Sequence, residues 1–228
     1  RSSSNPSFYH CTFEDNRVRR TGGENSNDAS GGAIFIQGNA MNTSTFLNID
    51  GCIFKNNAVF SKWGARGGAI YTSDSQVKIT NSLFYNNTTW ANSDGSNNNS
   101  SHGGAINMQS PTYYSSSDNQ WVGGKAIIIN STFANNRTVT GNISSNTTNG
   151  SAVFMESWSR GEKFWFFNNI VWGNIRGEKK ENSSTSDQVY ISDAAAAKNL
   201  NYNVIQNSGN LSAYQDDGSF ETDPAFAD

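Results

Sequence analysis

A four-residue motif, Gly-Gly-Ala-Ile, recurs along the chain and constrains its fold more than any other feature of the sequence. It starts at Gly31, Gly67 and Gly103, and a degenerate copy, Gly-Ser-Ala-Val, starts at Gly150, so the spacings are 36, 36 and 47 residues. A recurring period of this size is typical of architectures in which each unit packs only against its neighbours. The chain is therefore expected to form a solenoid.

A second motif, Cys/Ser-x-Phe-x-x-Asn, alternates with the first, and a short strand-like run precedes it, as in Leu47-Asn48-Ile49. Each unit thus contains three short strands joined by polar segments rich in turn-forming residues. Such units predict a coil in which each strand pairs in parallel with its equivalent one unit further on. Copies of the second motif run over 11–16, 52–57, 82–87 and 131–136, with degenerate copies over 169–174 and 203–208.

The predicted fold is therefore all-β: a parallel β-helix of about five or six rungs, with three short strands per rung and long polar loops. One short helix is expected near 193–198, where Ser192 and Asp193 precede a run of alanines. Residues 1–228 are expected to form a single domain, which is a piece of a longer secreted protein.

Alternation along the strands predicts which side chains point into the coil. One inward row begins with Ile34, Ile70 and Ile106, and another begins with Phe13 and Phe54. The asparagine that closes the second motif is expected where a strand turns, and stacked amides there would form a structural ladder. The ladder residues are Asn16, Asn57, Asn87, Asn136 and Asn174.

An aromatic stripe is expected on the outer side of the first strand of each unit. Outward aromatic residues in a strand ladder support either cross-strand packing beneath the loops or a contact face for sugar rings or another protein. Both interpretations remain open, and the stripe is the candidate ligand or partner face. It comprises Phe35, Tyr71, Phe154 and Tyr190, with Asn107 in the middle.

Charged residues make up only 15% of the chain, and the formal net charge is −3. Nucleic acid is therefore not an expected partner, because its binding requires a basic face. Arg17, Arg19 and Arg20 form the only basic cluster and are interpreted as a solvated turn. No apolar run approaches the ~18 residues needed to cross a bilayer, so membrane insertion is not expected.

The alternation of Gly-Gly-Ala-Ile with Phe-x-x-Asn resembles the repeats of right-handed parallel β-helix proteins of bacterial surfaces. The chain is most similar to the secreted choice-of-anchor Q group and to polymorphic outer-membrane-protein repeats, over nearly its whole length. Residues 169–174 match a late rung of that family, and 223–226 match its closing Asp-Pro-x-Phe motif. The resemblance implies a right-handed coil and an extracellular or cell-surface location, but a fold alone does not define a function.

Cys11 and Cys52 occupy the same position in consecutive units. Parallel strands in register lie about 4.8 Å apart, which is within the Cα range of a disulfide. Parallel side chains can still be oriented badly for the bond. The sequence therefore leaves open a disulfide or two free buried thiols, and either would be structural.

No catalytic constellation is found in the sequence. Glycoside hydrolysis needs two carboxylates about 5–9.5 Å apart, and no acidic pair recurs in register on one face. His10 and His102 have no zinc-ligand spacing to a partner. Asp216 and Asp217, with Glu221 and Asp223, form an acidic cluster that could hold Ca²⁺ through its oxygen atoms, but a closing turn at the end of the coil is the favoured interpretation. The chain is therefore predicted not to be an enzyme, and no metal or cofactor is expected.

Two functions of different classes remain. The preferred one is a non-catalytic extracellular module, structural or adhesive, which contacts cell-surface glycans or proteins or stacks end to end through open strand edges. The alternative is a carbohydrate-binding or polysaccharide-degrading protein whose groove is lined by the aromatic stripe and by loop tryptophans. Those tryptophans are Trp63, Trp90, Trp121 and Trp158.

Overall fold

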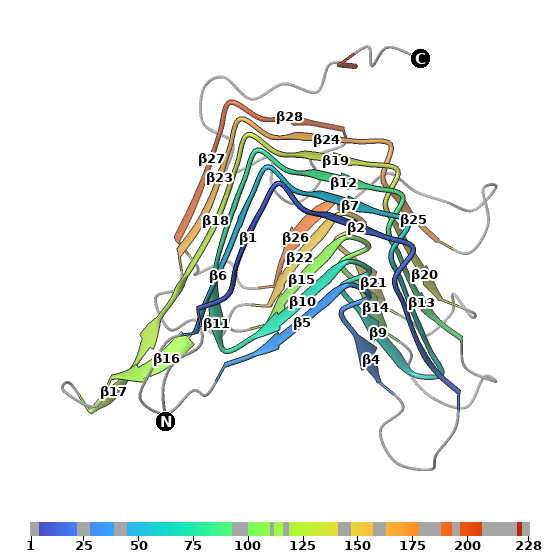
Figure 1. The fold of residues 1–228 in the computed structure, drawn as a ribbon, viewed down its shortest axis with the longest axis horizontal. Helices are drawn as coiled ribbons and strands as arrows, with labels where there is room; N and C mark the ends of the chain where they lie inside the picture. Colours follow the sequence, from blue (N-terminus) through green and yellow to red (C-terminus); the bar gives the residue numbers. More distant parts are fainter. Residues whose placement is uncertain are drawn as a thin grey trace.

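The computed structural model is built of β-strands throughout the part of the chain that it describes (Figure 1). Apart from one hairpin, its strands form parallel sheets in which each strand pairs with its equivalent from the next turn. The described residues are 5–21, 28–38, 45–92, 100–109, 112–115, 119–140, 147–156, 163–177, 188–192, 197–206 and 223–224.

Five parallel sheets, named A to E in the order in which the chain enters them, make up the coil. Sheet A contains β1 (Ser7–Tyr9), β6 (Thr45–Asp50), β11 (Ser75–Thr80), β18 (Lys125–Ile129), β23 (Lys163–Phe167) and β27 (Ala197–Asn201). Sheet B contains β2 (Thr12–Glu14), β7 (Ile53–Lys55), β12 (Leu83–Tyr85), β19 (Thr132–Ala134), β24 (Ile170–Trp172) and β28 (Val204–Ile205). Sheet C contains β3 (Arg17–Arg20), β8 (Ala58–Ser61), β13 (Thr88–Ala91), β20 (Arg137–Thr140) and β25 (Ile175–Arg176).

Two further parallel sheets complete the coil, and a two-stranded hairpin lies outside it. Sheet D contains β4 (Ala29–Ser30), β9 (Gly64–Arg66), β14 (Ser100–His102) and β21 (Thr147–Asn149). Sheet E contains β5 (Ile34–Gln37), β10 (Ile70–Ser73), β15 (Ile106–Gln109), β22 (Val153–Glu156) and β26 (Val189–Ile191). An antiparallel hairpin of β16 (Thr112–Ser115) and β17 (Gln120–Gly123) extends from the coil.

The all-β prediction is confirmed, and the stacking of equivalent strands is consistent with a parallel β-helix. The chain passes through all five sheets before it returns, since β11 pairs with β6 after β7 to β10 have intervened. A complete turn therefore has five strands, whereas the sequence predicted three. The two that the prediction missed belong to sheets C and D, whose inward positions hold mainly small or polar side chains such as Thr89, Ala65 and Ser101.

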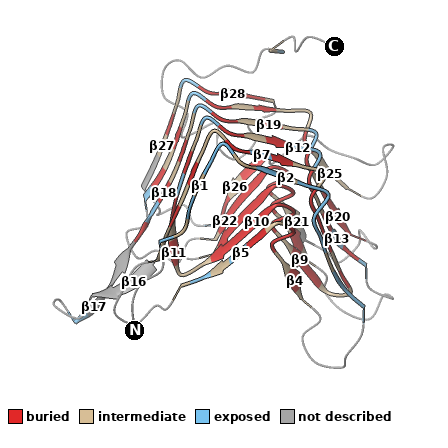
Figure 2. Cartoon of the chain, in the orientation of Figure 1, coloured by how far each residue is buried: buried red, intermediate tan, exposed pale blue. Residues whose placement is uncertain are grey.

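The sheets enclose two separate cores. Figure 1 shows sheets A, B and C as the sides and top of an arch, with sheets D and E inside it. A large apolar core fills the space between A, B and E, with Ile49, Phe54 and Ile70 among its fully buried members. A small core between C and D contains Ala29, Val59, Ala65 and Ala91. Burial in Figure 2 follows the same division.

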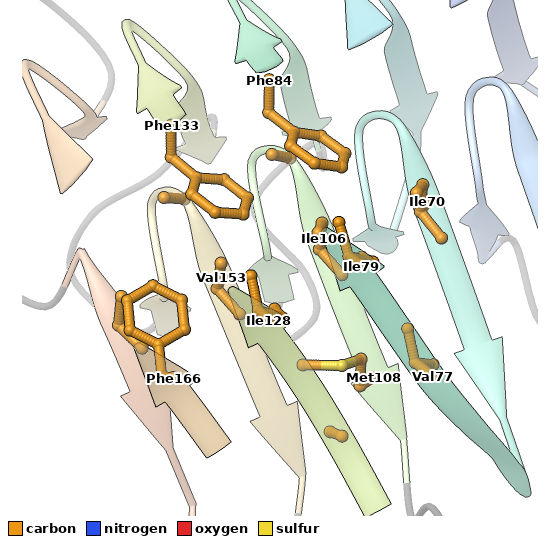
Figure 3. Packing of buried hydrophobic residues seen from close by; sticks show 14 of the residues in the cluster. Ile70, Val77, Ile79, Phe84, Ile106, Met108, Ile128, Phe133, Val153 and Phe166 are labelled. Carbon is orange, nitrogen blue, oxygen red and sulfur yellow. The ribbon is translucent and has the colours of Figure 1, made fainter. Parts of the chain in front are cut away.

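The predicted inward rows lie in register. Ile34, Ile70 and Ile106 are successive pairing partners in sheet E. In sheet B the ring planes of Phe54 and Phe84 are nearly parallel, with centroids 4.8 Å apart, and Phe84 stacks on Phe133 at the same distance. Figure 3 shows the rings of Phe84 and Phe133 above the aliphatic side chains of sheets A and E. The large core therefore repeats the same contact along the coil.

The Gly-Gly motif forms the corner between sheets D and E. The first glycine of the pair has positive φ, as at Gly67 (+61°), where a Cβ would be strained. The second packs against backbone: a Cβ at Gly68 would lie 2.0 Å from the carbonyl oxygen of Gly104 and 2.7 Å from the nitrogen of Thr88. The first glycine is thus explained by the backbone conformation of the tight corner, and the second by the close approach of neighbouring backbone.

Two local predictions need correction. Residues 193–196 of the predicted helix lie outside the described residues, but Ala197 and Lys198 belong to strand β27, which pairs with β23. Sheet pairing there overrides the high intrinsic helix propensity of alanine, because tertiary contacts outweigh propensity. The basic cluster Arg17–Arg20 is also not a turn: it forms β3, which pairs with β8.

Candidate functional site

The asparagines of the ladder lie at the corner between sheets B and C. The Asn57 Nδ2 donates a hydrogen bond to the Asn87 Oδ1 at 2.9 Å, and the Asn57 backbone N–H donates to the same oxygen at 3.0 Å. The Asn87 Nδ2 donates in turn to the Asn136 Oδ1 and to the carbonyl of Phe54, both at 2.9 Å. Equivalent bonds link Asn16 to Asn57 and Asn136 to Asn174. These side chains satisfy buried backbone groups where the chain turns.

A second ladder, which the sequence did not predict, lies at the corner between sheets A and B. The side chain of the first residue of each Cys/Ser-x-Phe-x-x-Asn motif accepts a hydrogen bond from the backbone N–H of the equivalent residue in the preceding turn. The Cys52 N–H thus donates to the Ser82 Oγ at 3.1 Å, and the Ser131 N–H donates to the Asn169 Oδ1 at 2.9 Å. Cys11 and Cys52 are free thiols in this ladder: the Cys11 N–H donates to the Cys52 sulfur at 3.4 Å.

The aromatic stripe of sheet E points away from the large core, but it is mostly covered. Phe35 is 55% exposed, whereas Tyr71 and Phe154 are only 6% and 7% exposed. The rings pack on one another, with centroids 5.2 Å apart for Phe35–Tyr71 and 5.6 Å apart for Phe154–Tyr190. The fully buried Asn107 lies in register between these two pairs.

Sheet D covers part of this stripe. The imidazole of His102 stacks on the ring of Phe154, with centroids 4.4 Å apart. Burial, and to a lesser extent the nearby Arg66 guanidinium, lowers the pKa of His102 to about 4. Arg66 also forms an ion pair with Asp28 at 3.2 Å. The space between sheets D and E is thus a packed wedge, and its aromatic faces are largely occupied by protein.

Tyr71 is held within the same wedge. Its hydroxyl donates a hydrogen bond to the Oε1 of Gln109, and burial is the main cause that raises the pKa of this phenol. The side chain is therefore a neutral, packed tyrosine at pH 7. The four stripe residues lie in one register row as two stacked pairs on either side of Asn107, in which Tyr71 and Phe154 are buried while Phe35 stays exposed.

A hollow of about 790 Å³ lies on the outer face of sheet C. It is lined by Phe60 and Trp90, and by the basic side chains Arg17, Arg19 and Lys62, with Arg20 beside them. Strand alternation explains this composition: Val18, Val59 and Thr89 face the small core, so their neighbours face outward.

The register of sheet C brings together residues from three turns of the coil. Arg19 pairs with Phe60, and Phe60 pairs with Trp90. The two rings lie 5.9 Å apart at an angle of 50°, and Trp90 remains 41% exposed. A second hollow of about 540 Å³ shares Arg17, Phe60 and Trp90 with the first and reaches Arg137. The two hollows therefore form one continuous surface, the sheet C face.

The charge of the sheet C face is opposite to that of the whole chain. Among the described residues that line the two hollows, five are cationic and Asp15 is the one acidic residue, although the chain has a net charge of −3. Arg20 donates a hydrogen bond to the carbonyl of Asp28 at 3.2 Å. Arg17 and Arg19 are exposed. A cationic surface beside exposed aromatic rings can hold an anionic ligand that also has flat apolar faces.

Sequence reasoning missed this site because it treated Arg17–Arg20 as a turn and assigned Trp90 to a loop. A usable signal was present. Each ladder asparagine is followed by a short alternating segment, and the outward third position of these segments holds Arg19, Phe60 and Trp90.

The other candidates contribute less. Trp63 is half-buried, whereas Trp158 and the acidic residues 216, 217 and 221 lie outside the described residues, and the structure does not describe the side chain of Trp121. Within the described ranges, no group of three or more His, Cys, Asp or Glu side chains could hold a metal ion. No helix in that part of the chain is long and apolar enough to cross a bilayer.

Comparisons of the chain with protein-family models, with curated proteins and with solved structures gave no match.

Proposed function

We propose that the chain is a non-catalytic extracellular β-helix module that acts in adhesion by holding a glycan on the sheet C face. The observation that carries this proposal is the pair of outward rings, Phe60 and Trp90, above a hollow of about 790 Å³. Aromatic rings combine large apolar contact area with little side-chain entropy to lose, which suits them to the flat faces of sugar rings.

The rest of the molecule supports a scaffold role. The two ladders and the phenylalanine stack repeat along the coil and support sheet C, and the ladder residue Asn57 also lines the smaller hollow. Rigid elements position binding groups better than loops do. Among the described residues that line the two hollows, Asp15 is the one carboxylate, and hydrolysis needs two. This favours binding over degradation of a polysaccharide.

The resemblance to bacterial surface proteins enters here as part of the proposal. The Gly-Gly corner and the Phe-x-x-Asn ladder support the likeness to choice-of-anchor Q and polymorphic outer-membrane-protein repeats, and that likeness implies a right-handed coil of about five or six rungs. A secreted, cell-surface location follows from that likeness. It agrees with a scaffold whose exposed face carries ligand-binding groups.

A second, structural role is favoured by the first turn of the coil. Strands β1, β2, β3 and β5 lie at the edges of their sheets. Phe13, at this end, is only partly buried, whereas its pairing partner Phe54 is fully buried. An edge of this kind can pair with a further copy of the chain. Sedimentation velocity over a concentration series tests this: stacking predicts growing species that Phe13→Asp abolishes, and a strictly monomeric chain contradicts it.

The test of the glycan proposal is a binding screen of the whole chain against a panel of neutral and acidic polysaccharides. Trp90→Ala is compared with Tyr85→Ala, because both side chains are similarly exposed (41% and 37%) but Tyr85 lies on sheet B. Loss of binding in Trp90→Ala alone supports the proposal. Absence of binding to every polysaccharide, or equal loss in both variants, contradicts it.

A further inference from the structure

We infer that the glycan is acidic, with Arg17 and Arg19 binding its carboxylate or sulfate groups while Phe60 and Trp90 support its sugar rings. This inference rests on the proposed function and specifies its ligand. The guanidinium group presents several donors in a planar fork, which matches the geometry of carboxylate and similar anions.

The arrangement of the side chains sets the direction of the ligand. Arg19, Phe60 and Trp90 are pairing partners on successive strands, so they form one row along the coil. A parallel row begins at Arg17, continues through Ala58 and Thr88 to Arg137, and extends to Ile175 on β25. Strands lie about 4.8 Å apart, so the two arginines of this row are separated by about 14 Å. A glycan chain lying along the coil would meet cations at both ends and aromatic rings between them.

A simpler explanation accounts for only part of this pattern. Charged residues on an edge strand prevent unwanted pairing, and β3 is an edge strand of sheet C. That role explains Arg17 and Arg19 but not the exposed ring of Trp90, which lies on the central strand β13. It also does not explain why Arg137, on the internal strand β20, lines the same surface.

Single-stranded nucleic acid would use similar groups, because bases also stack on aromatic rings. The chain as a whole carries a net charge of −3, and the described cations of the hollow are few, whereas a nucleic-acid strand needs an extended basic groove that follows its phosphate backbone. The observations therefore favour a glycan, which a few cations beside aromatic rings can bind at single carboxylate or sulfate groups.

The experiment measures the affinity of the whole chain for four probes: heparin, polygalacturonate, dextran and a single-stranded thymidine oligonucleotide. Each is titrated at several salt concentrations. The double variant Arg17→Gln/Arg19→Gln is compared with Lys78→Gln/Lys163→Gln. The control variant removes the same charge from exposed positions on sheet A. Circular dichroism confirms that both variants are folded.

The inference predicts that heparin or polygalacturonate binds, that dextran does not, and that the arginine variant loses at least about tenfold in affinity. The affinity of the arginine variant should also depend less on salt, since fewer counterions are released. The lysine variant should bind as the native chain does.

If dextran binds as tightly as the acidic glycans, and the arginine variant binds as tightly as the native chain, the inference of an acidic ligand is overturned. The proposed function would still stand. Failure of all three polysaccharides would overturn both. Binding of the oligonucleotide as tight as that of the acidic glycans would overturn the assignment to a glycan.

Discussion

The molecule has two outward aromatic rows, and they differ in what covers them. On sheet E, the rings of Tyr71 and Phe154 are 6% and 7% exposed, because neighbouring rings and His102 of sheet D pack on them. On sheet C, the ring of Trp90 is 41% exposed and borders a hollow. Alternation along a strand determines which way a side chain points, but the path of the other sheets determines whether solvent reaches it. The row on sheet E is thus part of the scaffold, and the row on sheet C is available to a ligand.

The largest expected difference between the rows is in stability. Phe154→Ala removes a buried ring from the wedge and should lower the free energy of unfolding by about 3–5 kcal/mol. Trp90→Ala should lower it by less than about 1 kcal/mol, because the ring is already partly solvated. Denaturant unfolding of both variants measures the difference. Equal losses would mean that the two rows have the same structural role.

Acid should destabilise the wedge through His102. The pKa of this residue is about 4 in the folded chain and 6.5 without burial, so the unfolded state binds the proton first as the pH falls. Above about pH 6.5, His102 does not change the free energy of unfolding. Between about pH 6.5 and 4 the free energy of unfolding falls as the pH falls, and below about pH 4 the total loss due to His102 is about 3 kcal/mol.

The measurement for this prediction is the difference in unfolding free energy between the native chain and His102→Gln at several pH values. The glutamine variant should lack the loss between pH 6.5 and 4, while the carboxylates common to both proteins cancel. Parallel pH profiles for the two proteins would show that the imidazole titrates normally and that the wedge is open to water.

The next effect concerns binding rather than stability. Trp90→Ala should weaken glycan binding by about tenfold to a hundredfold, as truncation of an aromatic anchor usually does. Phe35→Ala is the matched control, because Phe35 is the exposed member of the sheet E row. Titration calorimetry at constant salt gives both affinities, and a larger loss in Phe35→Ala would reverse the roles assigned to the two rows.

The smallest effect is expected at Asn107, which interrupts the aromatic row of sheet E. This residue is buried, and within the described chain its Oδ1 has no hydrogen-bond partner. Asn107→Leu should therefore leave stability unchanged or raise it by up to about 1 kcal/mol, because an uncompensated polar atom is removed. Thermal unfolding can detect this, and a loss above about 1 kcal/mol would indicate that the amide makes a needed contact.

The parts of the fold that were predictable from the sequence are those with large apolar side chains in a repeated register. A phenylalanine recurs in one motif, as at Phe54 and Phe84, and an isoleucine recurs in the other, as at Ile70. Sheets A, B and E could therefore be anticipated. Sheets C and D escape prediction because their inward positions hold few large apolar side chains and many small or hydroxyl ones. The Oγ of Ser101, for example, donates a hydrogen bond to the Oγ1 of Thr89 at 2.8 Å inside the small core.

The candidate site was hidden for the same reason. Without sheet C as a strand ladder, nothing in the sequence placed Arg19, Phe60 and Trp90 side by side, since about 30 to 40 residues separate each from the next. The stripe on sheet E was anticipated as outward-facing, but its burial depends on the return of sheet D, which periodicity along single strands does not encode.

The most direct test of the central claim is hydroxyl-radical footprinting of the whole chain with and without heparin, read by mass spectrometry at individual aromatic side chains. We predict that Phe60 and Trp90 become protected while Phe35 and Tyr190 react at unchanged rates. Protection of Phe35 and Tyr190 with no change at Phe60 and Trp90 would contradict the account and place the ligand on sheet E.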